Sequence, residues 1–102
     1  MQITDKVSVV TGAASGIGRA TALELVTQGA KGIALVDLNE RPLRDLADEI
    51  NSTAGSEVAL PFAGDVTDED FRALVFDEAT RQHGIVQIVV PAAGIFRDRM
   101  AV

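Results

Sequence analysis

Residues 11–18 read Thr-Gly-Ala-Ala-Ser-Gly-Ile-Gly, and they decide the fold because they lie between the apolar run Val7–Val10 and a helix-like stretch. In such a segment Gly12 can make the tight turn after the strand. Gly16 lets the backbone approach a ligand, and Gly18 lets the helix pack close to the strand. The unpaired N–H groups of the helix's first turn attract an anion. The segment therefore predicts a strand-turn-helix unit that can cradle a pyrophosphate.

A carboxylate follows the next apolar run at the position expected for a ribose contact. Asp37 lies 19 residues after Gly18, at the end of Ile33–Val36. A carboxylate there can accept hydrogen bonds from both ribose hydroxyls of an adenosine. Glycine-rich turns also occur in proteins that bind no nucleotide, and Asp37 could be a solvated side chain or a helix cap. Asn39 is the better candidate for the cap of the helix that starts near it.

Four apolar runs alternate with three helix-like segments, which is the pattern βαβαβαβ. This pattern predicts an α/β fold with parallel strands and right-handed crossovers, namely an incomplete Rossmann-like doubly wound sheet of strand order 3-2-1-4. Its ligand crevice is expected beyond the carboxyl ends of the first and fourth strands. The strands are expected at Val7–Thr11, Ile33–Asp37, Val58–Ala63 and Ile85–Val90.

The helix-like segments have recognisable starts and ends. The first is expected at Ile17–Gln28, with Gly29 as the left-handed stop. Residues 67–70 give the third helix a capped, acid-rich start, and His83-Gly84 ends it. The second helix has the clearest inward stripe, formed by Leu43, Leu46, Ala47 and Ile50. The last strand is apolar except at Gln87 and is expected to be covered on both faces.

Composition limits the function classes. The chain has 102 residues, which is one small domain at most, and its net charge of −6 argues against a nucleic-acid surface. It contains no apolar stretch near the roughly 20 residues of a membrane span and no secretion signal, so we expect a cytoplasmic protein. Cys is absent, and the acidic residues 68–70 are explained by helix capping, so no metal site is predicted.

Three segments together resemble the short-chain dehydrogenase/reductase family. The spacing G-x-x-x-G-x-G, with Thr11 in front of it, resembles that family's nucleotide-binding motif. Asp65-Val66 resembles its adenine-contacting pair, although Asp65 could equally be an ordinary turn residue. Residues 91–94, Pro-Ala-Ala-Gly, resemble a variant of its Asn-Asn-Ala-Gly turn, with Pro91 and Ala92 in place of two asparagines. Pro91 cannot donate to a ladder and should mark the strand's end or a bulge.

The resemblance implies a cofactor site for NAD. A carboxylate at Asp37 repels the 2′-phosphate of NADP, and neither Ser15 nor Leu38 is basic, although Arg41 lies close enough to leave NADP open. The implied contacts are Gly12, Ser15, Gly16, Ile17 and Gly18 for the pyrophosphate, Asp37 and Leu38 for the adenosine ribose, Asp65 and Val66 for adenine, and Ala92, Ala93 and Gly94 for the nicotinamide side.

The family's catalytic segment is not in this sequence. That chemistry uses a Ser and a Tyr-x-x-x-Lys segment, whereas this chain has no Tyr and only two lysines, Lys6 and Lys31. His83, the only histidine, has no partner in the sequence that suggests a base. We therefore assign no catalytic residue and expect residues 1–102 to be the N-terminal portion of a Rossmann-type NAD-binding domain.

The resemblance implies that the complete protein is a homo-oligomeric oxidoreductase that interconverts a small alcohol and a carbonyl. The alternative is a non-catalytic module that binds adenine nucleotides, either as a truncated protein or as one chain of a split protein.

Overall fold

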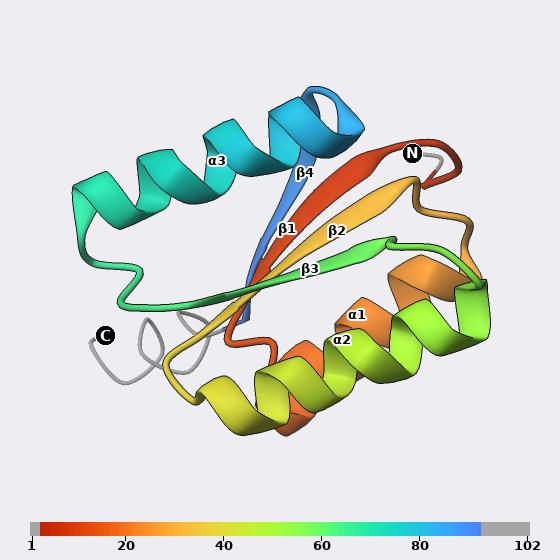
Figure 1. Ribbon diagram of the computed structural model, residues 1–102, viewed down its shortest axis with the longest axis horizontal. Coiled ribbons are helices and arrows are strands. Elements are labelled where there is room, and N and C mark those ends of the chain that lie inside the picture. The colour runs from red at the N-terminus through yellow and green to blue at the C-terminus, as the bar shows by residue number, and fades with distance from the viewer. Residues whose placement is uncertain (1–2, 93–102) are drawn as a thin grey trace, which may run out of the picture.

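The computed structural model describes residues 3–92 and contains a parallel sheet of four strands in the order β3-β2-β1-β4. Helices α1 and α2 cover one face of the sheet and α3 covers the other (Figure 1). This arrangement confirms the predicted Rossmann-like fold and strand order. The elements are β1 (Val7–Thr11), α1 (Gly16–Thr27), β2 (Gly32–Asp37), α2 (Glu40–Ala54), β3 (Ala59–Ala63), α3 (Glu69–His83) and β4 (Val86–Pro91).

The strand register brings the carboxyl ends of the strands together. Thr11 lies beside Val36 on one side and Pro91 on the other, and Asp37 pairs with Ala63. Because the strands are parallel, the segments that follow them all leave from this edge of the sheet. The predicted site residues on those segments are therefore brought to one edge.

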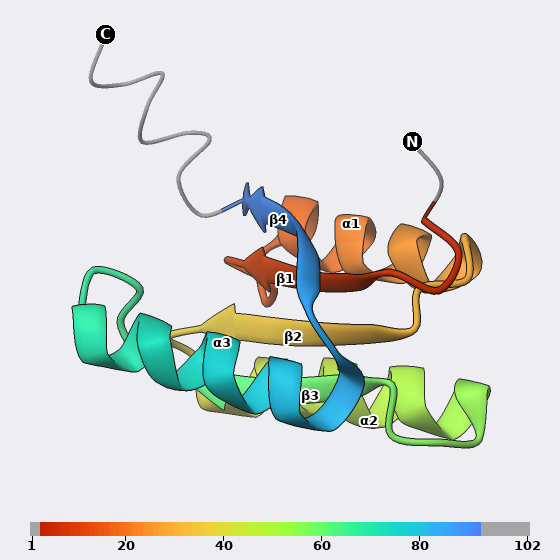
Figure 2. The ribbon, with the colours of Figure 1, turned by 90° about the horizontal axis from the view of Figure 1, so that it is seen from above.

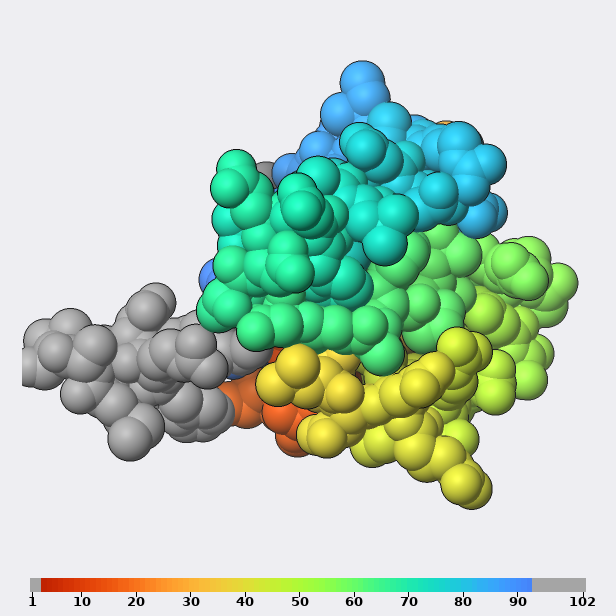
Figure 3. All heavy atoms as spheres, turned by 60° about the vertical axis from the view of Figure 1, so that its left-hand side comes forward, coloured from red at the N-terminus to blue at the C-terminus, as the bar shows by residue number. Residues whose placement is uncertain are grey.

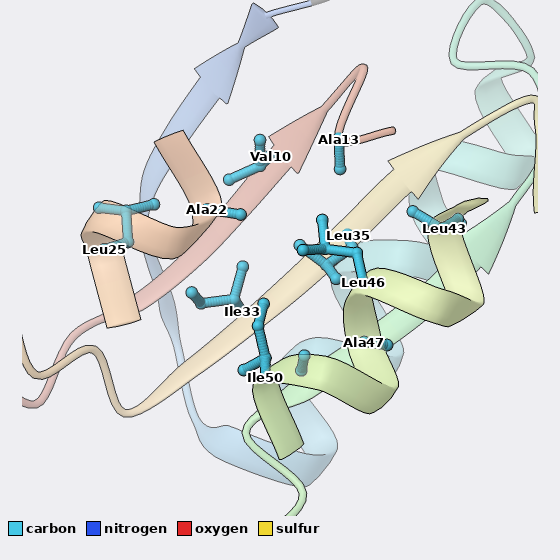
Figure 4. Packing of buried hydrophobic residues seen from close by; sticks show 11 residues of the cluster. Val10, Ala13, Ala22, Leu25, Ile33, Leu35, Leu43, Leu46, Ala47 and Ile50 are labelled. Carbon is cyan, nitrogen blue, oxygen red and sulfur yellow. The ribbon is translucent and has the colours of Figure 1, made fainter. Parts of the chain in front are cut away.

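The main core lies between the sheet and the α1/α2 layer (Figure 4). The predicted stripe of α2 is buried, with each of its four side chains at most 2% exposed, and it packs against Ile33 and Leu35 of β2. A second, smaller cluster on the opposite face joins Val75 and Ala79 of α3 to strands β1 and β2. The two layers fix the sheet from both sides, as a doubly wound fold requires.

The predicted helix ends agree with the structure to within one or two residues. The prediction that Gly29 ends the first helix is confirmed. Gly29 follows α1 with φ 90°, a left-handed conformation that costs glycine little. The cap of α2 differs from the expectation. Asn39 occupies the N-cap position, but its side chain makes no capping hydrogen bond.

The prediction that the last strand is covered on both faces is wrong for the described part of the chain. Along β4, half-buried residues alternate with exposed ones, and Val89 is 52% exposed. The reason is that β4 is an edge strand (Figure 2) and the buried side chains of α3 lie over β1 and β2. Pro91 ends the strand, as predicted, and the pairing of β4 with β1 shifts register between Val7 and Ser8.

Candidate functional site

A hollow lies at the carboxyl edge of the sheet, among the segments that follow β1, β2 and β3. Figure 3 views this edge: the yellow segment after β2 lies beside the green segment after β3, and the orange-red start of α1 is next to them. The structure thus brings together Gly12, Asp37, Leu38, Asp65 and Val66, which the sequence predicted for one site. The complete lining is Gly12, Asp37, Leu38, Gly64, Asp65, Val66 and Thr67.

Asp37 links the end of β2 to the glycine loop. Its Oδ2 accepts a hydrogen bond from the Ala14 N–H at 3.0 Å, and its Oδ1 accepts one from the Asn39 N–H at 2.9 Å. Each carboxylate oxygen has a second lone pair that can accept from a ligand hydroxyl. The two backbone bonds fix the orientation of the carboxylate, so it is preorganised at the rim of the hollow.

Leu38 extends the hollow with an apolar surface. Leu38 is 72% exposed. An exposed apolar side chain at the rim of a pocket is suited to contact the apolar part of a bound ligand.

Two glycines of the loop are required by the protein itself. Gly12 has φ 66°, in the left-handed region that disfavours side chains. A Cβ atom on Gly18 would lie 1.9 Å from the carbonyl oxygen of Gly12, so only glycine allows this close approach of α1 to the loop. These are the turn and packing roles that the sequence predicted.

Gly16 differs from them. A Cβ atom built on Gly16 meets nothing within 4 Å, and the residue is exposed. Within residues 3–92, the structure gives the N–H groups of Gly16 and Ile17 no hydrogen-bond partner. Open space beside two unsatisfied N–H groups at a helix N-terminus is what an anion site requires.

Ser15 has a structural role in addition to its predicted binding role. Its hydroxyl donates to the Gly12 carbonyl oxygen at 2.6 Å and accepts from the Gly18 N–H at 3.1 Å. The side chain therefore caps α1 and ties the two ends of the loop together.

The turn after β3 is held by its own side chains. Asp65 Oδ1 accepts from the Thr67 N–H at 2.8 Å and from the Thr67 hydroxyl at 2.7 Å. The third helix is capped by Asp68, whose Oδ1 accepts from the N–H groups of Asp70 and Phe71. Thr67 therefore supports Asp65, and the cap of the helix is Asp68.

The nicotinamide side of the predicted site is only partly described. Ala92 follows β4 at the same edge of the sheet and is buried, with 3% of its surface exposed. Ala93 and Gly94 lie outside the described residues, so their predicted contacts stay predictions.

His83 lies away from this site, at the end of α3 beside the first residue of β2. Its ring packs against Gly32, where a Cβ atom would come within 2.3 Å of the ring carbon Cγ. Burial, with a smaller contribution from the positive charge of Lys31, lowers the pKa of His83 below its ordinary value, and Glu57 opposes the shift. The position supports the expectation that His83 is not a base of the site.

Across the part of the chain that is described, no cluster of three or more His, Cys, Asp or Glu residues could hold a metal ion, and no helix is long and apolar enough to cross a membrane.

Two residues that line the hollow, Thr67 and Gly64, were not predicted from the sequence. Thr67 could have been found from the spacing Asp-x-Thr, in which the aspartate accepts from the backbone two residues later. Gly64 could have been suspected from its place between the strand end and Asp65. Its N–H donates to the Asp37 carbonyl oxygen at 3.0 Å, and this bond joins the segments after β2 and β3.

The chain belongs to the short chain dehydrogenase family, whose profile matches residues 6–102. It is 40% identical over 91 residues to the probable oxidoreductase EphD of Mycobacterium tuberculosis, covering 89% of this chain and 15% of that protein. It is 36% identical over 102 residues to the 3-oxoacyl-(acyl-carrier-protein) reductase FabG of Thermotoga maritima, covering all of this chain and 40% of that protein.

The fold also matches solved structures of this family. A short chain dehydrogenase/reductase from Burkholderia phymatum, crystallised in complex with NAD, superimposes with a TM-score of 0.79 at 30% identity, over 87% of this chain and 31% of that one. A short-chain type dehydrogenase/reductase from Mycobacterium marinum gives a TM-score of 0.75 at 33% identity, over 86% of this chain and 34% of that one. The chain thus spans well under half the length of these relatives.

Proposed function

We propose that this chain is the NAD-binding N-terminal portion of a short-chain dehydrogenase/reductase. The observation that carries the proposal is the contrast between two glycines of one loop. Gly18 is required by a backbone contact, whereas Gly16 faces open space, so the protein's own packing gives no reason for a glycine there. A ligand that passes over Gly16 would supply the reason, and the neighbouring N–H groups suit a pyrophosphate.

The individual contacts are assigned as the family resemblance implies, and five of the assigned residues, Gly12, Asp37, Leu38, Asp65 and Val66, line the hollow. Gly12, Ser15 and residues 16–18 form the pyrophosphate side, and Asp37 with Leu38 forms the ribose side. Asp65 and Val66 form the adenine side, where a carboxylate oxygen can accept from the 6-amino group of the base. Ala92, Ala93 and Gly94 are assigned to the nicotinamide side.

NAD is favoured over NADP by the charge at the ribose side. If Asp37 binds the adenosine ribose as proposed, its carboxylate would face a 2′-phosphate, and two like charges at close range repel each other. The cation nearest in sequence, Arg41, has 91% of its side chain exposed and forms an ion pair with Asp45 at 3.8 Å. Arg41 is not among the residues that line the hollow.

In a complete protein the bound nicotinamide would accept or donate the hydride of an alcohol–carbonyl interconversion. The residues of this chain would bind and orient the dinucleotide, and the proton transfer would fall to groups that this sequence does not contain. The non-catalytic alternative shares the same binding site, so binding experiments on this chain test what the two hypotheses have in common.

The direct test is calorimetric titration of the 102-residue chain with NAD, NADP and ADP-ribose. We expect ADP-ribose and NAD to bind with similar affinity, because most assigned contacts lie on their shared part, and NADP to bind more weakly. A folded chain that binds none of the three contradicts the proposal. Tighter binding of NADP than of NAD contradicts only the cofactor preference.

A further inference from the structure

One peptide group beside the adenine side is held at both of its ends. The carbonyl oxygen of Val66 accepts a hydrogen bond from Arg72 Nη1 at 2.7 Å. The N–H of the same peptide group, that of Thr67, donates to Asp65 Oδ1 at 2.8 Å. A peptide plane that is bonded on both sides cannot rotate without breaking one of the bonds.

This peptide group connects Arg72 to the carboxylate of Asp65. The Thr67 hydroxyl donates to the same oxygen, Oδ1, at 2.7 Å, so the orientation of the Asp65 carboxylate depends on where Thr67 lies. Asp65, Val66 and Thr67 all line the hollow, whereas Arg72 does not. Arg72 lies on the α3 side, where it borders a separate apolar hollow that Val66 also lines.

The close approach of α3 to this turn makes the Arg72 contact possible. A Cβ atom on Gly64 would lie 2.4 Å from Cε1 of Phe71, so the Phe71 ring occupies the space that a side chain at Gly64 would need. The first turn of α3 is thereby seated directly against residues 64–67. Arg72 follows Phe71 in this turn, and its guanidinium group therefore reaches the carbonyl oxygen of Val66.

Resting on the proposed function, we propose that Arg72 is a positioning residue for recognition of the base. It holds the Val66–Thr67 peptide in the orientation that presents Asp65 and Val66 to adenine. A guanidinium suits this task because its donors have a fixed planar geometry and it stays charged at every relevant pH. Loss of Arg72 should therefore weaken the preference for adenine over other bases and leave the pyrophosphate contacts intact.

The test compares NAD with nicotinamide hypoxanthine dinucleotide, which carries an oxo group and a ring N–H where adenine has a 6-amino group and a ring nitrogen. Both ligands share the pyrophosphate and both riboses. Affinities are measured by calorimetry for the unaltered chain, Arg72→Met, Arg72→Lys and Arg81→Met. Arg81 is the matched control, because it lies on the same helix and, among the described residues, pairs only with Glu78.

We expect Arg72→Met to reduce the preference for NAD over the hypoxanthine analogue by about threefold to tenfold, which corresponds to the loss of one hydrogen bond. Arg72→Lys, which keeps a charged donor, should retain more of the preference, and Arg81→Met should retain all of it. An unchanged preference in Arg72→Met overturns the inference. Equal losses for both ligands, accompanied by a lower melting temperature, also overturn it because they indicate a merely structural role. If the unaltered chain binds neither ligand, the proposed function itself fails.

Discussion

The Asp37 carboxylate and the Ala14 N–H are joined by a hydrogen bond of 3.0 Å, which ties the end of β2 to the glycine loop that follows β1. The carboxylate proposed to bind ribose is thus also a structural element of the pyrophosphate loop. The ribose and pyrophosphate parts of the proposed site are therefore coupled through one side chain.

Replacement of Asp37 by Ala should weaken NAD binding more than NADP binding. The substitution removes the proposed bonds to both ribose hydroxyls, each worth about 1.5 to 3 kcal/mol when one partner is charged. For NADP the same substitution also removes a repulsion. Calorimetry should show at least about a tenfold loss for NAD. Asp37→Asn is the control, because it keeps an acceptor oxygen and loses the charge. Equal losses for the two cofactors in Asp37→Ala would contradict the ribose assignment.

Gly16→Val and Gly18→Ala should fail in different ways. Gly16 has open space around its Cα, so Gly16→Val should fold and lose nucleotide binding because the side chain fills the ligand's path. Gly18→Ala places a methyl group 1.9 Å from the Gly12 carbonyl oxygen and should destabilise the fold itself. Circular dichroism with thermal melting separates these effects, and a titration measures binding. A folded Gly16→Val chain with retained affinity would show that the loop is only a turn.

The elements with strong periodicity were predictable from the sequence, and the contacts between segments were not. The stripe of α2 is determined by local spacing, so its burial followed directly. The Asp37–Ala14 and Arg72–Val66 contacts join residues whose approach depends on how layers pack, which periodicity does not encode. The exposure of β4 was missed for a similar reason, since an apolar run indicates a strand but not which elements cover it.

Acidification should destabilise the chain through His83. Burial lowers the pKa of His83 in the folded state below its value in the unfolded chain, about 6.5. The unfolded chain then binds more protons between the two pKa values. Stability is therefore complete above about pH 6.5, falls as the pH decreases toward the folded-state pKa, and levels off below it. Denaturant melts between pH 7 and 5 should show this loss, and His83→Gln should reduce it. An identical pH dependence in both proteins would exclude His83 as the cause.

The 102-residue chain should self-associate through β4 and the neighbouring surface of α3. Val89 is 52% exposed and Ile85, just before the strand, is 76% exposed, while Phe76 of α3, which borders the same hollow as Val89, is 37% exposed. Among residues 3–92, β4 is also an edge strand, and no described strand pairs with its outer backbone groups. Burial of such apolar surface contributes roughly 25 cal/mol per Å², so contact between two copies is favourable.

Light scattering on material confirmed by mass to end at Val102 tests this association, and Val89→Lys tests its location. A lysine on the exposed face of an edge strand opposes strand pairing, so Val89→Lys should shift the chain toward monomer. Gln28→Lys adds the same charge at an exposed position after α1 and should leave association unchanged. A stable monomer of the unaltered chain at micromolar concentration would show that the exposed β4 surface does not drive pairing. Association that persists in Val89→Lys would place the contact elsewhere on the molecule.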